Sequence, residues 1–146
     1  MINNLSLLIT TFFYIGKIRY APGTFSSLAT LIIWILLIPS DYFIRILMVF
    51  LLIIIGFIFI KISLPNFQEK DPQIIVIDEV IGMSIALMFI NNNLLIMMIA
   101  FLLFRILDIL KPSIIYYSQD FPGAYGILLD DILAGLITAM LLITYI

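Results

Sequence analysis

The sequence contains no cysteine and no histidine among its 146 residues. Without cysteine, a thiol nucleophile, a zinc–thiolate site and a disulfide framework are all excluded. Without histidine, the commonest general base and the commonest transition-metal ligand are also absent. Any chemistry must therefore rely on carboxylates, lysine, arginine, hydroxyl groups or the backbone.

Charge is also scarce: only 11% of the residues are charged, whereas 64% are hydrophobic. A water-soluble domain of this length would need more polar surface to cover its core, so we expect the excess apolar surface to face lipid. The net charge of −2 and the lack of a basic arm give no indication of a nucleic-acid partner. The length suits one unit, and we expect residues 1–146 to form a single membrane-embedded domain.

The apolar runs are long and unbroken, which favours helices over membrane strands that alternate in polarity. We therefore predict an all-α fold, a polytopic membrane helical bundle with about five spans. The predicted spans are residues 24–38, 42–60, 74–90, 94–110 and 125–146. Residues 5–15 are too few to span hydrocarbon and are predicted to form a short N-terminal interfacial or re-entrant helix of the mature protein. Residues 63–73 and 113–124 contain prolines and are predicted to be loops.

Basic residues indicate the orientation of these spans, because positively charged loops stay cytoplasmic. Six basic residues fall on one side of alternating spans: Lys17, Arg19, Lys61, Lys70, Arg105 and Lys111. That side is predicted to be cytoplasmic, and Arg45 lies near the opposite face. Five spans place the C-terminus opposite the N-terminus, unless the last helix is re-entrant.

Acidic residues on three predicted helices fall at a common depth. Counted from the opposite end of each span, Asp78 lies 12 residues in, Asp108 lies 14 and Asp131 lies 15. At 1.5 Å per residue these are depths of about 18, 21 and 22 Å. Asp78 with Glu79, Asp108, and Asp130 with Asp131 are therefore predicted to meet just inside the cytoplasmic edge of the hydrocarbon. Because successive helical residues point about 100° apart, we expect one member of each adjacent pair to face the site.

Carboxylates at this depth cost several kcal/mol each unless they are paired, protonated or bound to a cation. Arg105 and Lys111 each lie three residues from Asp108 and supply two positive charges. An all-oxygen ligand set selects a hard metal, Mg²⁺ first and then Mn²⁺ or Ca²⁺. We predict that the five acids form both the metal site and the catalytic site: Asp78, Glu79, Asp108, Asp130 and Asp131. Which of them bind metal and which act as base stays open.

The other acids near this face have an ordinary explanation. Glu69, Asp71 and Asp120 lie in or beside predicted loops and are expected to be solvated or to cap helices. Asp41 lies on the far side. None of the four is assigned to the site.

A turn of small residues precedes the first predicted span. Residues 21–27, Ala-Pro-Gly-Thr-Phe-Ser-Ser, offer hydroxyl groups and free backbone N–H groups at a helix N-terminus, which suit phosphate. The same pattern is also that of a plain turn and helix cap. We take Gly23 and Thr24, with Arg105 and Lys111, as candidate phosphate-binding residues.

Glycines one helical turn from two of the acids indicate close packing. Gly82 follows Asp78 by four residues, and Gly135 follows Asp131 by four. Small residues on one helix face let membrane helices approach each other. Ordinary helix packing and the building of a site would both use them.

Four segments of the sequence resemble the phosphatidylglycerophosphatase A family in order and spacing. They are APGTFSSL (residues 21–28), DPQIIVIDEVIGMSIAL (71–87), FRILDILKPSII (104–115) and GAYGILLDDILAG (123–135). The last is the most specific, because its glycines, both aspartates and its final Ala-Gly all match. Two departures are Ser26, where the family usually has glycine, and Ile114, where it usually has a second proline.

The resemblance implies a Mg²⁺-dependent phosphatase of the bacterial cell inner membrane with its active site on the cytoplasmic side. The implied reaction removes the terminal phosphate of the phospholipid phosphatidylglycerophosphate to give phosphatidylglycerol. Water would be activated by a carboxylate or by metal-bound hydroxide, and a phospho-aspartate intermediate stays possible.

Other classes of function remain as alternatives. A cation transporter or channel would also gather acids in a membrane, but near the midplane and along a path to both faces. A CDP-alcohol phosphotransferase also uses carboxylates and Mg²⁺, but its spaced aspartates with interleaved glycines are absent here. Another Mg²⁺-dependent phospholipid enzyme would act on a different phosphomonoester. The oligomeric state is left open.

Overall fold

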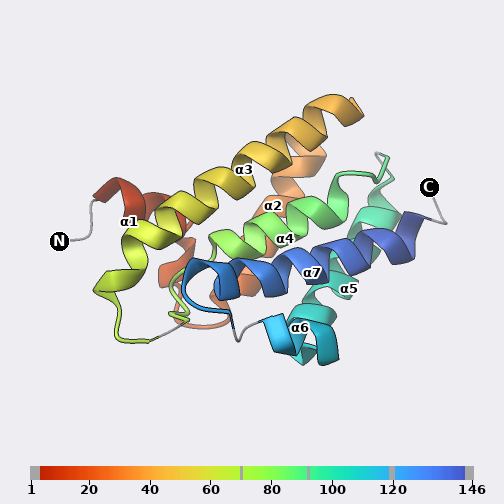
Figure 1. Cartoon of the computed structure of the whole chain (residues 1–146). Coiled ribbons are helices and arrows are strands. Elements are labelled where there is room, and N and C mark those ends of the chain that lie inside the picture. Colours follow the sequence, from red (N-terminus) through yellow and green to blue (C-terminus); the bar gives the residue numbers. More distant parts are fainter. Residues whose placement is uncertain (1–3, 70, 92, 119–120, 144–146) are drawn as a thin grey trace.

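The computed structural model describes residues 4–69, 71–91, 93–118 and 121–143. This part of the chain folds into seven α-helices and two short 3₁₀ helices, without a β-strand, which confirms the predicted all-α class (Figure 1). The α-helices are α1 (Asn4–Thr10), α2 (Pro22–Leu37), α3 (Tyr42–Ser63), α4 (Ile77–Leu87), α5 (Leu94–Leu110), α6 (Ser113–Ser118) and α7 (Ala124–Leu142). The 3₁₀ helices are η1 (Ile15–Lys17) and η2 (Leu64–Asn66).

Helix α4 lies at the centre of the bundle and packs against α2, α3, α5 and α7 (Figure 1). Every residue of α4 except Glu79 is buried. A helix that is apolar on all sides is the expected occupant of such a position. Its first turn, which carries two acids, is consequently buried as well.

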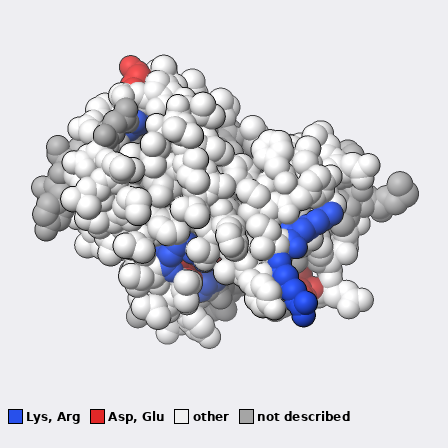
Figure 2. Space-filling view, turned by 180° about the vertical axis from the view of Figure 1, so that it is seen from behind, with Lys and Arg blue, Asp and Glu red and all other residues white. Residues whose placement is uncertain are grey.

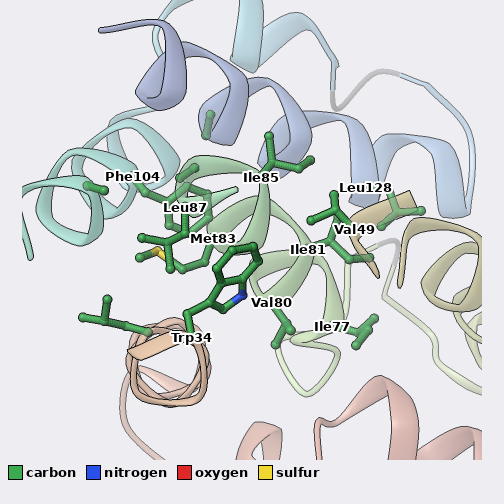
Figure 3. Close-up of a cluster of buried hydrophobic side chains, with 14 of the residues drawn as sticks. Trp34, Val49, Ile77, Val80, Ile81, Met83, Ile85, Leu87, Phe104 and Leu128 are labelled. Carbon is green, nitrogen blue, oxygen red and sulfur yellow. The ribbon is translucent and has the colours of Figure 1, made fainter. Parts of the chain in front are cut away.

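The apolar core surrounds α4 and joins it to its neighbours. Figure 3 shows Trp34 of α2 and Phe104 of α5 on the same side of α4 as Met83 and Leu87. The indole N–H of Trp34 donates a hydrogen bond to the Ser84 hydroxyl at 3.2 Å. A buried indole N–H needs such a partner, so this bond fixes how α2 sits on α4.

Helices α4 and α7 cross at two glycines. A Cβ atom on Gly135 would overlap the carbonyl oxygen of Gly82. A Cβ atom on Gly82 would lie 2.6 Å from the carbonyl oxygen of Asp131 and 2.7 Å from Cε2 of Phe104. The two backbones therefore approach as closely as the small residues in the sequence suggest.

The predicted helix boundaries hold best where the sequence carries a cap. Helix α5 has the predicted bounds, and the Asn93 side chain accepts from the backbone N–H groups of Leu95 and Ile96. Helix α2 begins two residues earlier than predicted, because Pro22 is well suited to the first helical turn. Helix α3 runs three residues further than predicted, to Ser63.

Helix α4 is much shorter than the predicted segment 74–90. The residues before it form a turn, in which the N–H of Ile75 donates to Pro72 and that of Val76 donates to Thr10. These isoleucine and valine side chains are buried without being helical. Hydrophobicity predicted their burial correctly and their helical conformation wrongly.

Two further expectations are corrected. Residues 113–118, predicted as loop, form α6, in which the N–H of Ile115 donates to the carbonyl of Pro112. The predicted N-terminal helix 5–15 ends at Thr10, because Phe12, Phe13 and Tyr14 all have positive φ angles of 45°, 55° and 67°. Left-handed residues end an α-helix, and η1 follows them.

The predicted count of five spans is not confirmed. Among the described residues, two helices are long and apolar enough to cross a membrane, α3 together with η2 (Tyr42–Asn66) and α7 (Ala124–Leu142). Helix α2 is apolar but has 16 residues, and α4 has 11. Helix α3 exposes most of its apolar side chains. Figure 2 shows the molecule from the side opposite to Figure 1, where small groups of charged side chains interrupt a mostly uncharged surface.

Arg45 joins three helix ends at the end of the bundle opposite the acids. Its side chain is fully buried, its Nε donates to the Pro39 carbonyl at 2.7 Å, and its Nη1 donates to the Ile90 carbonyl at 2.5 Å. Its guanidinium also lies 5.4 Å from the centre of the Trp34 ring, within cation–π range. One side chain thus ties α3 to the ends of α2 and α4.

Replacing Arg45 by methionine is expected to destabilise the fold, because two carbonyl groups then lose charged hydrogen bonds. The expected loss is about 2–5 kcal/mol, or a fall of about 5–15 °C in the thermal unfolding midpoint. Lys61→Met removes a charge from an exposed position of the same helix and is the control. Equal midpoints for the two variants in detergent would contradict this role of Arg45.

Candidate active site

Five segments converge on a cavity of about 290 Å³ at the end of the bundle opposite Arg45. They are the N-terminal ends of α2 and α4, the C-terminal end of α5, the middle of α7 and the turn before α4. The lining residues are Ala21, Pro22, Gly23, Asp71, Gln73, Ile75, Asp78, Glu79, Arg105, Asp108, Lys111, Asp130 and Asp131. The cavity is therefore both acidic and basic within a largely apolar molecule.

Eight of the nine residues singled out from the sequence line this cavity. They are Gly23, Asp78, Glu79, Arg105, Asp108, Lys111, Asp130 and Asp131. The exception is Thr24, which is half-buried on α2 beside Gly23 but does not line the cavity. Lys70 and Asp120 lie outside the described residues.

Both members of each adjacent acidic pair line the cavity, so the expectation that only one would face it is wrong. The two acids of α7 have different partners, because they lie on neighbouring faces of that helix. Asp130 Oδ2 accepts a hydrogen bond from Lys111 Nζ at 2.7 Å. Asp131 instead joins the acids of α4 across the glycine crossing.

Three carboxylates form a compact group at the junction of α4 and α7. One oxygen from each of Asp78, Glu79 and Asp131 lies within 4.8 Å of the other two. Asp78 and Asp131 are only 7% and 3% exposed. Three like charges this close in a poorly hydrated site repel one another strongly, so the group requires protons or a cation.

Four carboxylate oxygens in the described part of the chain are buried without a hydrogen-bond partner. They are Asp78 Oδ1, Glu79 Oε2, Asp130 Oδ1 and Asp131 Oδ1. Buried polar atoms in folded proteins nearly always have partners, so several orphans in one cavity indicate a missing ligand. Carboxylate oxygens are the donors that hard divalent cations prefer, and the residues present fit such an ion.

The two cationic side chains of the cavity are each held by an acid. Arg105 Nη1 donates to Asp108 Oδ2 on the next turn of α5. Lys111 bridges to Asp130 on α7, and its backbone is left-handed, with φ of 44° at the end of α5. Arg105 Nε is buried and has no partner within the described residues. The site therefore offers an unused cationic donor next to unused anionic acceptors.

Asp71 and Gln73 line the cavity although sequence reasoning left them out. Asp71 was expected to be solvated or to cap a helix because it lies in a predicted loop. As a residue it is exposed, but its carboxyl group lies among cavity atoms, and this desolvation raises its pKa while nearby Lys111 opposes the shift. Its place in the segment 71–87, which resembles the family, was the available signal.

Lys111 keeps its charge despite partial burial. Burial lowers the pKa of Lys111, but the hydrogen bond to Asp130 and the surrounding carboxylates outweigh it and leave the pKa above its ordinary value. The ammonium group is consequently a permanent positive charge at neutral pH. It can attract an anion to the cavity at any physiological pH.

Gly23 brings the N-terminus of α2 against Glu79. A Cβ atom on Gly23 would overlap Glu79 Oε1 and lie 3.3 Å from Arg105 Nη1. The hydroxyls of Ser26 and Ser27 both donate to the Gly23 carbonyl at 2.8 Å, which holds this first turn in place. Gly23 thus provides the space in which Glu79 and Arg105 meet.

Comparison with known proteins gives a consistent family. The model of the family described as Phosphatidylglycerophosphatase A matches residues 8–146. A Phosphatidylglycerophosphatase A of Escherichia coli (strain K12) is 36% identical over 87% of this chain and 75% of its own length. Its namesake in Haemophilus influenzae is 34% identical over 83% of this chain and 76% of its own length.

A third relative carries a different name. A Bacteroides thetaiotaomicron protein, provisionally named a phosphatidylinositol-3-phosphatase, is 35% identical over 94% of this chain and 91% of its own length. No solved structure matches this chain. All three names describe phosphatases of phosphorylated lipids.

Substituting Gly23 by alanine is expected to displace Glu79 and lower the rate of any reaction at this site by about 10²-fold, because misplacement by about 1 Å has effects of that size. Shortening the acid in the double variant Gly23→Ala/Glu79→Asp removes the overlap. We expect the double variant to lose less activity than the two single effects multiplied. Strictly multiplicative losses would refute the steric link.

Proposed function

The chain belongs to the phosphatidylglycerophosphatase A family, and we propose that it is a Mg²⁺-dependent phosphatase that removes the terminal phosphate of phosphatidylglycerophosphate to release phosphatidylglycerol. The observation that carries this proposal is the group of orphaned carboxylate oxygens on Asp78, Glu79 and Asp131, beside the cations Arg105 and Lys111. A divalent cation would neutralise the carboxylates of this group, and the phosphate of a phosphomonoester would neutralise the two cations.

Arg105 and Lys111 bind the phosphate oxygens in this proposal. Arg105 has the buried donor Nε to spare, and guanidinium groups match the geometry of phosphate oxygens. Asp108 and Asp130 orient these two cations through the ion pairs of the cavity. The N-terminal turn of α2 at Gly23 adds backbone N–H groups, which favour an anion at a helix N-terminus.

Asp78, Glu79 and Asp131 are the residues that would hold the metal ion. When bound there, Mg²⁺ supplies charge neutralisation at the phosphate and lowers the pKa of water. Asp130 is the candidate general base, since its Oδ2 is engaged by Lys111 while its Oδ1 is free to accept a proton from the attacking water. Thr24 lies beside Gly23 on α2 but outside the lining of the cavity.

We propose further that the protein is a multi-pass protein of the bacterial cell inner membrane, with the cavity on the cytoplasmic side. Support comes from the exposed apolar side chains of α3 and from the basic residues that gather toward the cavity end, among them Lys61 and Lys111. A site at this depth lets a lipid present its phosphate while its acyl chains stay in the bilayer.

A second headgroup is a candidate because of the relative from Bacteroides thetaiotaomicron, which aligns over 94% of this chain under a name that specifies a phosphoinositide. The same residues would act on either phosphomonoester. A cation transporter is not favoured, since the described acids, Asp41 apart, lie toward one end of the bundle and the relatives are named as phosphatases.

Metal removal should abolish phosphate release, because the repulsion within the acidic group would no longer be compensated. We expect purified protein to release phosphate from phosphatidylglycerophosphate, to lose that activity in EDTA and to regain it on addition of Mg²⁺. Phosphatidylinositol 3-phosphate and phosphatidic acid tested in parallel identify the headgroup. Phosphate release that EDTA does not affect would contradict the metal proposal. A preference for phosphatidylinositol 3-phosphate would show that this lipid, and not phosphatidylglycerophosphate, is the substrate.

Asp131→Asn should lower phosphate release by about 10²-fold or more, because it removes one of the three carboxylates that would hold the metal ion. It should also abolish the rise in thermal midpoint that Mg²⁺ gives the unmodified protein, since that rise reflects binding to the folded state. Asp41→Asn is the matched control, because Asp41 caps α3 by accepting from the N–H of Ile44 and asparagine caps equally well. Full activity of the Asp131 variant would remove this residue from the site.

A further inference from the structure

Asp71 is the one acid lining the cavity that has no partner among the described residues. Of the other five acids, three form the compact carboxylate group, and two are paired with the cations Arg105 and Lys111. Asp71 lines the same cavity but forms no hydrogen bond or ion pair with a described residue. A titratable group that lines such a cavity without a structural partner is a candidate for a part in the chemistry.

Asp71 lies at the opening of the cavity, and the aspartates of the helices lie deeper. Among the lining residues, Ala21, Asp71 and Gln73 are exposed. The lining aspartates of α4, α5 and α7 are all buried, and Asp130 is only 5% exposed. A phosphate ester that enters through this opening would therefore place its phosphate among the buried residues and the rest of the molecule beside Asp71.

The two sides of a bound phosphate need different groups. Water attacks phosphorus in line with the bond that breaks, so the attacking and leaving oxygens lie on opposite sides of the phosphorus atom. Because the lipid stays outside the cavity, the leaving oxygen faces the opening. In phosphatidylglycerophosphate this oxygen belongs to a glycerol alcohol, whose alkoxide is a strong base and a poor leaving group. A positioned proton donor typically accelerates such a step by about 10²–10⁴-fold.

Asp71 and Asp130 have environments that suit opposite directions of proton transfer. Asp130 accepts a hydrogen bond from the ammonium group of Lys111, which favours its charged form and its use as a base. Asp71 has no such bond, and desolvation raises its pKa despite nearby Lys111, which favours the protonated form that an acid needs. Because Asp71 is exposed as a residue, solvent can return its proton after each reaction.

We propose that Asp71 is the general acid that gives its proton to the leaving oxygen when the phosphate ester bond breaks. The inference rests on the proposed function. As the oxygen of water bonds to phosphorus, one water proton passes to Asp130. The bond between phosphorus and the glycerol oxygen breaks, its electron pair stays on that oxygen, and the oxygen takes the proton of Asp71. Phosphate and the lipid alcohol are released, and solvent then restores the proton of Asp71 and removes that of Asp130.

A substrate with sulfur in place of the leaving oxygen separates an acid from other roles of Asp71. A thiol has an ordinary pKa of about 8.5, so a thiolate leaves without receiving a proton, whereas an alkoxide does not. The experiment compares phosphatidylglycerophosphate with its analogue in which sulfur bridges the glycerol and the terminal phosphate. The quantity measured, in the presence of Mg²⁺, is the ratio of kcat/KM for the oxygen substrate to kcat/KM for the sulfur substrate.

Asp71→Asn should lower this ratio by about 10²-fold or more, because asparagine has no acidic proton and only the oxygen substrate needs one. Glu69→Gln is the matched control, since it removes an exposed acid of the same segment that does not line the cavity. The control should have the ratio of the unmodified protein. An unchanged ratio in Asp71→Asn, or an equal fall in both variants, would overturn the proposal.

Binding of Mg²⁺ gives a readout that does not depend on turnover. If Asp71 is an acid and not a metal ligand, its removal leaves the metal site intact. The rise in thermal midpoint that Mg²⁺ gives the unmodified protein should therefore persist in Asp71→Asn, in contrast to Asp131→Asn. Loss of this rise in Asp71→Asn would assign the residue to the metal ion and refute its role as the acid.

The two proposals fail in distinguishable ways. If the unmodified protein releases no phosphate from the oxygen substrate in the presence of Mg²⁺, the proposed function fails. If it does release phosphate but Asp71→Asn lowers kcat/KM equally for the oxygen and sulfur substrates, the function stands and the assignment of Asp71 as the acid fails.

Discussion

The structure depends on the contact between the backbones of α4 and α7 at Gly82 and Gly135. Any side chain at Gly135 would overlap the Gly82 carbonyl, so the approach exists only because both positions lack a Cβ atom. This contact lies one helical turn from Asp78 on α4 and one from Asp131 on α7. The glycines therefore bring together two carboxylates that electrostatics alone would hold apart.

At the opposite end of the bundle, a single cationic side chain joins the ends of the helices. Arg45 is completely buried and satisfies carbonyls at the ends of α2 and α4, which packing alone would leave unpaired. With their far ends joined, α2 and α3 can diverge toward the other end without falling apart. Close backbone contact brings the acids of the cavity together at one end, and a charged side chain joins the helices at the other end.

Prediction from the sequence succeeded where a residue type has one structural role. It failed where contacts between distant segments determine the backbone conformation. The depth count brought the five acids together because helical rise is constant, and Asn93 gave the start of α5 because it caps. The predicted span 74–90 was too long because Ile75 and Val76 are buried in a turn bound to Thr10, which hydropathy does not distinguish from a helix. Asp71 was missed because its role depends on where the chain returns to the cavity. Residues 12–14 have positive φ angles although none of them is glycine, so the sequence does not indicate their conformation.

The charge balance of the cavity links its stability to its ligands. Six acids line it, counting Asp71, and only Arg105 and Lys111 oppose them. Each of these two cations is already paired with one acid, so Arg105, which also lies near Glu79, does not balance the three carboxylates of Asp78, Glu79 and Asp131. A divalent cation relieves this repulsion, and a phosphate anion can then bind to Arg105 and Lys111. The fold therefore retains a destabilising cluster because binding, and not folding, supplies its compensation.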